Sequence, residues 1–60
     1  MRFYTVSEVA KILRVRKSYV YELVHQKRLR ALRLSERCIR IPEEALREFV
    51  EQEAGRTGAN

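Results

Sequence analysis

The chain is short of the residues from which disulfide-bonded, metal-binding and catalytic sites are built. Its 60 residues include one cysteine, one histidine, one proline and two glycines, and no tryptophan. A single cysteine forms no internal disulfide, and one cysteine with one histidine is too small a set for a zinc site. The sequence also shows no nucleophile–base pair and no carboxylate pair. We therefore expect no metal, no other cofactor and no enzymatic activity.

Long apolar segments are missing as well. No run approaches the roughly 18 apolar residues of a transmembrane helix, and the N-terminus lacks the apolar core of a signal peptide. We expect a cytoplasmic protein without a membrane partner. A chain of this length buries only about 60% of its unfolded surface, so it has one small core. We place a single domain at residues 1–53 and a flexible tail at residues 54–60.

What the chain has in excess is positive charge, and this charge is concentrated in its middle. Lys and Arg number 13 against 8 Asp and Glu, a net charge of +5. Residues 11–40 contain ten Lys and Arg and two Glu, a net charge of +8, whereas residues 41–60 contain five Glu and two Arg, a net charge of −3. A block of one sign is typical of a surface that contacts a phosphate backbone, and a solubilising face is the alternative.

The hydrophobic pattern predicts three helices. Apolar residues recur with helical spacing from Val6 to Leu13, and Thr5-x-x-Glu8 forms a capping box in front of them. After a short break a second helix is expected at residues 17–26. Pro42 suits the start of a third helix. Its apolar stripe comprises Ala45, Leu46, Phe49 and Val50.

Between the second and third helices the period changes to two, which indicates a β-hairpin. Leu32 and Leu34 alternate with charge in the first strand, and Ile39 and Ile41 do so in the second. We expect these four apolar side chains to face inward. The side chains expected outward or at the tip are Arg33, Arg37 and Arg40.

Two short helices with a tight break between them, the second opening on basic residues, form the pattern of a helix-turn-helix. In this motif the second helix lies in the major groove of DNA and reads base edges near its start. A basic hairpin directly afterwards would be a wing beside the groove. The order of elements therefore predicts a winged helix-turn-helix, a mainly α-helical fold with a small β-hairpin.

The start of the second helix supplies the first group of predicted DNA-contacting residues. Arg16, Lys17 and Ser18 would contact phosphates and base edges, and cations at a helix N-terminus oppose its dipole, which makes them poor choices for stability alone. One of Tyr19 and Tyr21 is expected to pack partly on the core while the other offers its hydroxyl to a phosphate. The sequence leaves open which tyrosine has which role.

The remaining predicted contacts follow along the chain. Glu22 either accepts a hydrogen bond from cytosine or pairs with a neighbouring arginine. The segment after the second helix would follow the DNA backbone through Lys27, Arg28 and Arg30. The wing arginines would enter the minor groove or contact phosphates, unless they only protect a strand edge from aggregation. These arginines are Arg33, Arg37 and Arg40.

Three stretches of the chain resemble the excisionase-type, MerR-like winged helix-turn-helix domains. They are residues 4–13 (YTVSEVAKIL), 15–24 (VRKSYVYELV) and 39–46 (IRIPEEAL), and the resemblance covers about residues 3–52. Members of that group usually have glycine where Arg14 stands, often glycine near Lys27, and serine or aspartate at the position of Arg16. Either the two turns differ here, or the chain accepts a cost of about 1 kcal/mol for each non-glycine residue at positive φ.

The resemblance implies a small DNA-binding protein. With the short chain, it favours an excisionase-like function: sequence-specific binding of double-stranded DNA as an architectural factor in the recombination of a mobile element. An integrase or another recombinase would then be a partner, the protein would be associated with the nucleoid, and copies would associate on adjacent DNA sites. A small transcription regulator that uses the same face, with RNA polymerase as partner, is the alternative. An adaptor that recruits acidic proteins is a further one.

Overall fold

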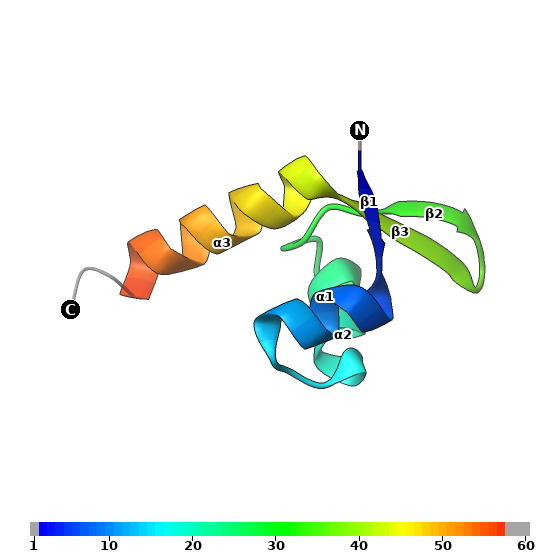
Figure 1. Ribbon diagram of the computed structural model, residues 1–60, viewed down its shortest axis with the longest axis horizontal. Helices are drawn as coiled ribbons and strands as arrows, with labels where there is room; N and C mark the ends of the chain where they lie inside the picture. Colours follow the sequence, from blue (N-terminus) through cyan, green and yellow to red (C-terminus); the bar gives the residue numbers. More distant parts are fainter. Residues whose placement is uncertain (1, 58–60) are drawn as a thin grey trace.

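The computed structural model describes residues 2–57, with side chains as far as residue 54, and shows three helices and a three-stranded antiparallel sheet over that range (Figure 1). In chain order the elements are β1 (Phe3–Thr5), α1 (Val6–Leu13), α2 (Lys17–His25), β2 (Leu32–Ser35), β3 (Cys38–Pro42) and α3 (Glu43–Thr57). The hairpin β2–β3 projects from one side of the α1–α2 pair, and α3 extends on the other side (Figure 1). The predicted fold, a mainly helical winged helix-turn-helix, is confirmed.

The starts of α1 and α2 lie where the sequence places them. The Thr5 hydroxyl accepts a hydrogen bond from the Glu8 backbone N–H at 3.0 Å, and the Glu8 carboxylate accepts one from the Thr5 N–H at 2.8 Å. This is the predicted capping box, which satisfies two N–H groups that α1 leaves free. At the start of α2, Arg16 is the N-cap residue and its side chain makes no capping hydrogen bond.

Strand β1 has no counterpart among the predicted elements. It pairs antiparallel with β3, with Phe3 opposite Pro42 and Thr5 opposite Arg40, so the sheet order is β1-β3-β2. Three residues are too few to show an alternating pattern, and their partner strand is distant in sequence. The pairing also makes Pro42 the last residue of β3, and α3 begins one residue later, at Glu43.

The two strands of the wing differ in burial. Ile39 and Ile41 in β3 face inward as expected, with 6% and 0% of their surface exposed. Leu32 and Leu34 in β2 are 46% and 65% exposed. The prediction that β2 buries its leucines was therefore wrong.

The strand register explains this difference. Leu32 lies opposite Arg40, while Arg33 lies opposite Ile39. Opposite residues share a face of a sheet, so Leu32 is on the face away from the core and Arg33 on the face of Ile39. Alternation within a strand defines two faces without saying which one is buried, and the register also shifts between Arg33 and Ser35.

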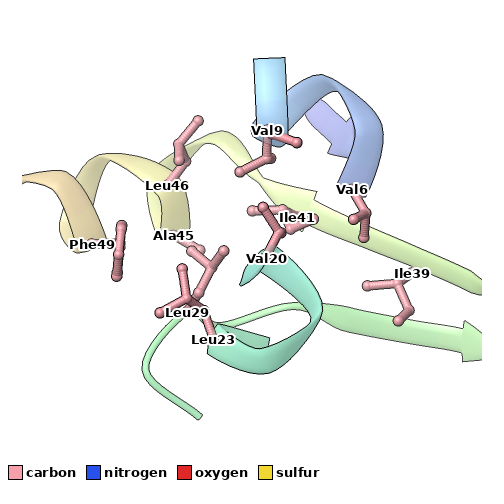
Figure 2. Packing of buried hydrophobic residues seen from close by; sticks show 11 residues of the cluster. Val6, Val9, Val20, Leu23, Leu29, Ile39, Ile41, Ala45, Leu46 and Phe49 are labelled. Atoms are coloured by element: carbon pink, nitrogen blue, oxygen red, sulfur yellow. The ribbon is translucent and has the colours of Figure 1, made fainter. Parts of the chain in front are cut away.

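One hydrophobic core holds the helices and β3 together (Figure 2). Val9, Val20 and Ile41 are fully buried at its centre. Leu29, in the loop between α2 and β2, is also buried, at 1% exposure, although no periodic pattern marked it. The predicted stripe of α3 is confirmed for three of its members, but Val50 is 43% exposed. The other buried side chains are Val6, Ala10, Leu23, Ile39, Ala45, Leu46 and Phe49.

A cationic residue in the left-handed conformation follows each helix of the helix-turn-helix, directly after α1 and two residues after the end of α2. Arg14 has φ 57° and Lys27 has φ 63°. This conformation lets the next backbone N–H turn back to the helix, so that Val15 donates to the Ala10 carbonyl at 2.9 Å. After α2 the corresponding bonds run from Lys27 to Val24 and from Arg28 to Leu23, both at 3.0 Å. The two turns therefore have the left-handed conformation that glycine usually adopts, and Arg14 and Lys27 adopt it at the cost of backbone strain.

Helix α3 is longer than predicted. It continues through residues 54–57, beyond the expected end of the domain at residue 53. The sequence of this stretch has no apolar period, but backbone hydrogen bonds extend an existing helix without one. Residues 58–60, the rest of the expected tail, lie outside the described residues.

Because the two strands of the wing differ in burial, we expect substitutions in β3 to lower the free energy of unfolding more than substitutions in β2. Because Ile41 is fully buried, Ile41→Val is expected to lower the free energy of unfolding by about 0.5–1.5 kcal/mol and Ile41→Ala by about 2–5 kcal/mol. Leu34→Ala, at an exposed position, is expected to change it by less than about 0.5 kcal/mol. Urea unfolding followed by circular dichroism measures all three. A loss for Leu34→Ala as large as that for Ile41→Ala would contradict the register.

The left-handed turn after α1 predicts a gain from glycine. Arg14→Gly and Arg14→Ala both remove the guanidinium, but only glycine relieves the strain at positive φ. We expect the glycine variant to be more stable than the alanine variant by about 1 kcal/mol in the same urea measurement. Equal stabilities would show that residue 14 is not left-handed in solution.

Candidate nucleic-acid interface

The packing of α2 determines which of its side chains reach solvent. Val20 and Leu23 are buried against the core, so the opposite face of the helix is exposed. That face carries Lys17, Ser18, Tyr21, Glu22 and His25. The helix begins after a break of only three residues, 14–16. This short break and the burial of Val20 and Leu23 fix its position against α1.

The start of α2 is suited to an anion. Its first backbone N–H groups receive no side-chain cap and point outward with the positive end of the helix dipole. Arg16, Lys17 and Ser18 are exposed at this end. The residues predicted to open the second helix therefore surround a site of positive potential.

A hollow of about 180 Å³ lies between α2 and the wing, and we call it the basic hollow. It brings together four of the predicted DNA-contacting residues: Lys17 and Tyr21 from α2, and Arg37 and Arg40 from the wing. None of the described residues that line it is acidic. Its full lining is Thr5, Val6, Ser7, Lys17, Tyr21, Arg37, Ile39 and Arg40.

Two features of the basic hollow depend on the sheet. The Arg40 guanidinium donates a hydrogen bond to the Ile39 carbonyl at 3.0 Å, which restrains its orientation. Thr5 and Ser7 line the hollow because β1 pairs with β3 and brings the start of α1 beside the wing. Ser7 is not among the predicted DNA-contacting residues, because no local signal in the sequence marks its hydroxyl.

The structure separates the two tyrosines. Tyr21 is 50% exposed and lines the basic hollow. Tyr19 is 42% exposed and does not line the basic hollow. Neither belongs to the side chains buried in the core. Of the two, Tyr21 is therefore the one placed beside the cations of both α2 and the wing.

The basic segment after α2 is partly neutralised by acids of α3. Arg28 pairs with Glu53 at 2.9 Å, and Arg30 pairs with Glu48 at 3.0 Å. The hydrogen bond and the charge of Glu53 raise the pKa of the Arg28 guanidinium. These two arginines have partners within the chain, whereas the basic hollow is lined by cations without acids. Their contact with DNA stays a prediction.

Glu22 has its hydrogen-bond partner on its own helix. Its carboxylate accepts a bond from the Gln26 side-chain amide at 3.5 Å, one helical turn away. The two ion pairs of the described residues both involve α3, so the expected pairing of Glu22 with a neighbouring arginine is not seen. Its contact with a base stays a prediction.

A second, larger hollow of about 630 Å³ lies between the C-terminal end of α2, the following loop and the start of β2. It collects three more predicted residues, Lys27, Arg30 and Arg33. Half of its lining residues are apolar, a larger share than in the basic hollow. We call it the large hollow. It is lined by Val24, His25, Lys27, Arg30, Ala31, Leu32, Arg33 and Pro42.

Over residues 2–57, no three His, Cys, Asp or Glu side chains come together as a metal site would require. No helix in that range combines the length and apolar character needed to cross a membrane. Cys38 is a half-buried free thiol at the start of β3.

A tight two-helix unit, a wing and a cationic hollow between them define a helix-turn-helix domain of the DNA-binding class. The model of the family described as "Helix-turn-helix domain" matches residues 3–54, and the chain belongs to this family. The family indicates DNA as the partner, which confirms that part of the predicted resemblance. No curated protein and no solved structure matches the chain.

The position of Tyr21 predicts unequal effects of removing the two tyrosine hydroxyls. Tyr21→Phe is expected to weaken binding to duplex DNA about three- to tenfold, the equivalent of one lost hydrogen bond, whereas Tyr19→Phe changes it less than about twofold. Fluorescence anisotropy with a labelled duplex measures both variants. Equal weakening by the two would contradict the assignment.

Proposed function

We propose that this protein binds double-stranded DNA in a sequence-specific manner, with α2 in the major groove and the β2–β3 wing on the adjacent backbone or in the minor groove. The observation that carries the proposal is the basic hollow, where Lys17 and Tyr21 of α2 stand beside Arg37 and Arg40 of the wing. The proposed activity is binding and not catalysis.

The dimensions of α2 fit this mode of binding. An α-helix with its side chains is about 10–12 Å across, which matches the roughly 12 Å width of the major groove, so α2 can lie in it. The exposed start of the helix presents Arg16, Lys17 and Ser18 to base edges. Arginine and lysine donate to the O6 and N7 atoms of guanine, so these side chains are suited to reading sequence.

The basic hollow accounts for the backbone contacts. A DNA strand that passes from the major to the minor groove runs between the recognition helix and the wing of a winged helix-turn-helix. A phosphate at this point would be met by Lys17 from one side and Arg37 from the other. Such contacts set the orientation of the protein on the duplex and supply the salt-dependent part of the affinity.

For the biological setting we propose an excisionase-like role, in which the protein shapes DNA for a recombinase at a mobile element. It is supported by the resemblance of residues 4–13, 15–24 and 39–46 to excisionase-type domains. A DNA-bending assay and an excision assay with the integrase of the same element test it. Occupancy of a promoter without bending or excision would favour the transcription regulator.

The salt dependence of binding tests the interface itself. We expect log K to fall linearly with log salt for a duplex, with a slope of about −0.9 per phosphate contact. Lys17→Ala and Arg37→Ala should each make the slope shallower by about one unit, because each removes one contact. Anisotropy titrations at several salt concentrations measure the slopes.

Arg47→Ala is the matched control for these variants. Arg47 is an exposed cation of α3 that lines neither hollow, so its removal changes the net charge equally but leaves the interface intact. Its slope should equal that of the unmodified protein. Equal slopes for all three variants would show that only the net charge of the protein matters. The absence of duplex binding at low salt would refute the proposed function.

A further inference from the structure

The large hollow is lined by both apolar and basic residues, and a DNA backbone would use only the basic ones. Four of its lining residues are apolar, Val24, Ala31, Leu32 and Pro42, and we call them the floor. The other four are His25, Lys27, Arg30 and Arg33, and we call them the rim. A phosphate group would satisfy the rim but leave the floor in contact with water.

Leu32 contributes exposed apolar surface to the floor of the large hollow. Leu32 is 46% exposed because its register in the wing turns it away from the core. Phe3, which lies opposite Pro42 on the same face of the sheet, is 43% exposed. Apolar surface gathered beside a hollow favours an occupant that removes it from water.

One cation of the rim, Arg30, already pairs with a carboxylate of the chain. Glu48 of α3 pairs with Arg30 at 3.0 Å, at the edge of the hollow. Lys27 and Arg33 stand elsewhere on the rim and, among the described residues, have no acid in ion-pair distance. An occupant that complements this charge pattern carries acidic groups on either side of an apolar one.

We propose that the large hollow docks an acidic segment of a partner protein, with an apolar side chain on the floor and flanking carboxylates at Lys27 and Arg33. The volume of about 630 Å³ accommodates one or two large side chains. Because the cations come from the loop after α2 and from β2, a peptide segment spans them better than a small molecule would. This interaction goes beyond the proposed binding of DNA.

A synthetic peptide of sequence EELFED, labelled with fluorescein, is the probe. We expect saturable binding to the full chain. Binding should be lost for the uncharged peptide QQLFQN and for the peptide EEAAED, because each keeps only one of the two chemistries. Fluorescence anisotropy measures the three affinities. No saturable binding of EELFED, or equal binding of QQLFQN, would overturn the proposal.

Variants of the protein locate the site. Leu32→Ser and Arg33→Ala are expected to raise the Kd of the peptide about tenfold. Leu34→Ser and Arg37→Ala are the matched controls, since they remove a leucine and an arginine of the same wing that do not line the large hollow; each should change the Kd less than about twofold. Circular dichroism establishes that all four variants are folded. An equal rise in the Kd of the peptide for the two test variants and the two controls would contradict the assignment of the peptide to the large hollow.

Two further measurements separate this site from other occupants. Sedimentation of the protein alone tests for self-association, and a dimer that Leu32→Ser abolishes would assign the hollow to a second copy and overturn the proposal. In a duplex titration, Leu32→Ser should leave the affinity for DNA unchanged while Arg37→Ala lowers it. A loss of DNA binding in Leu32→Ser would assign the hollow to DNA, whereas failure of DNA binding in every variant would refute the proposed function alone.

Discussion

The pairing of β3 with β1 on one side and β2 on the other is the interaction on which the rest of this structure depends. It places Ile39 and Ile41 over the two helices, where they complete the core. It holds the wing beside α2 and brings the start of α1 to the same place. Without this central strand the domain would be a two-helix unit with no fixed wing, since a hairpin alone is marginally stable in water.

The tertiary structure also determines which of the basic side chains are paired with acidic ones. Two acidic residues of α3, Glu48 and Glu53, pair with Arg30 and Arg28 in the loop after α2. Surface pairs of this kind contribute little to stability, so their main effect is on where positive potential remains. Lys17 and Arg37 have no acid in ion-pair distance among the described residues. The net charge of +5 is thus the balance between a basic segment, residues 11–40 with +8, and an acidic segment, residues 41–60 with −3.

Much of the fold could be predicted because its signals are local. Thr5 and Glu8 cap α1 through neighbours three residues apart, and the apolar period of each helix lies within one short segment. Leu29 and Val50 depart from the prediction for a common reason: their burial depends on which other segment packs over them. The left-handed turns at Arg14 and Lys27 show that a backbone conformation persists without its preferred glycine when the tertiary contacts on both sides require it.

By itself the sequence determined the order of helices and wing, the capping of α1 and the basic character of residues 11–40, because these follow from spacing and composition. Only the tertiary structure decided the face on which each wing residue lies, the separation of Tyr19 from Tyr21 and the division of the cations between two hollows. These depend on strand register and on contacts between distant segments. A register is set by pairing between strands, and no periodicity within one strand contains that information.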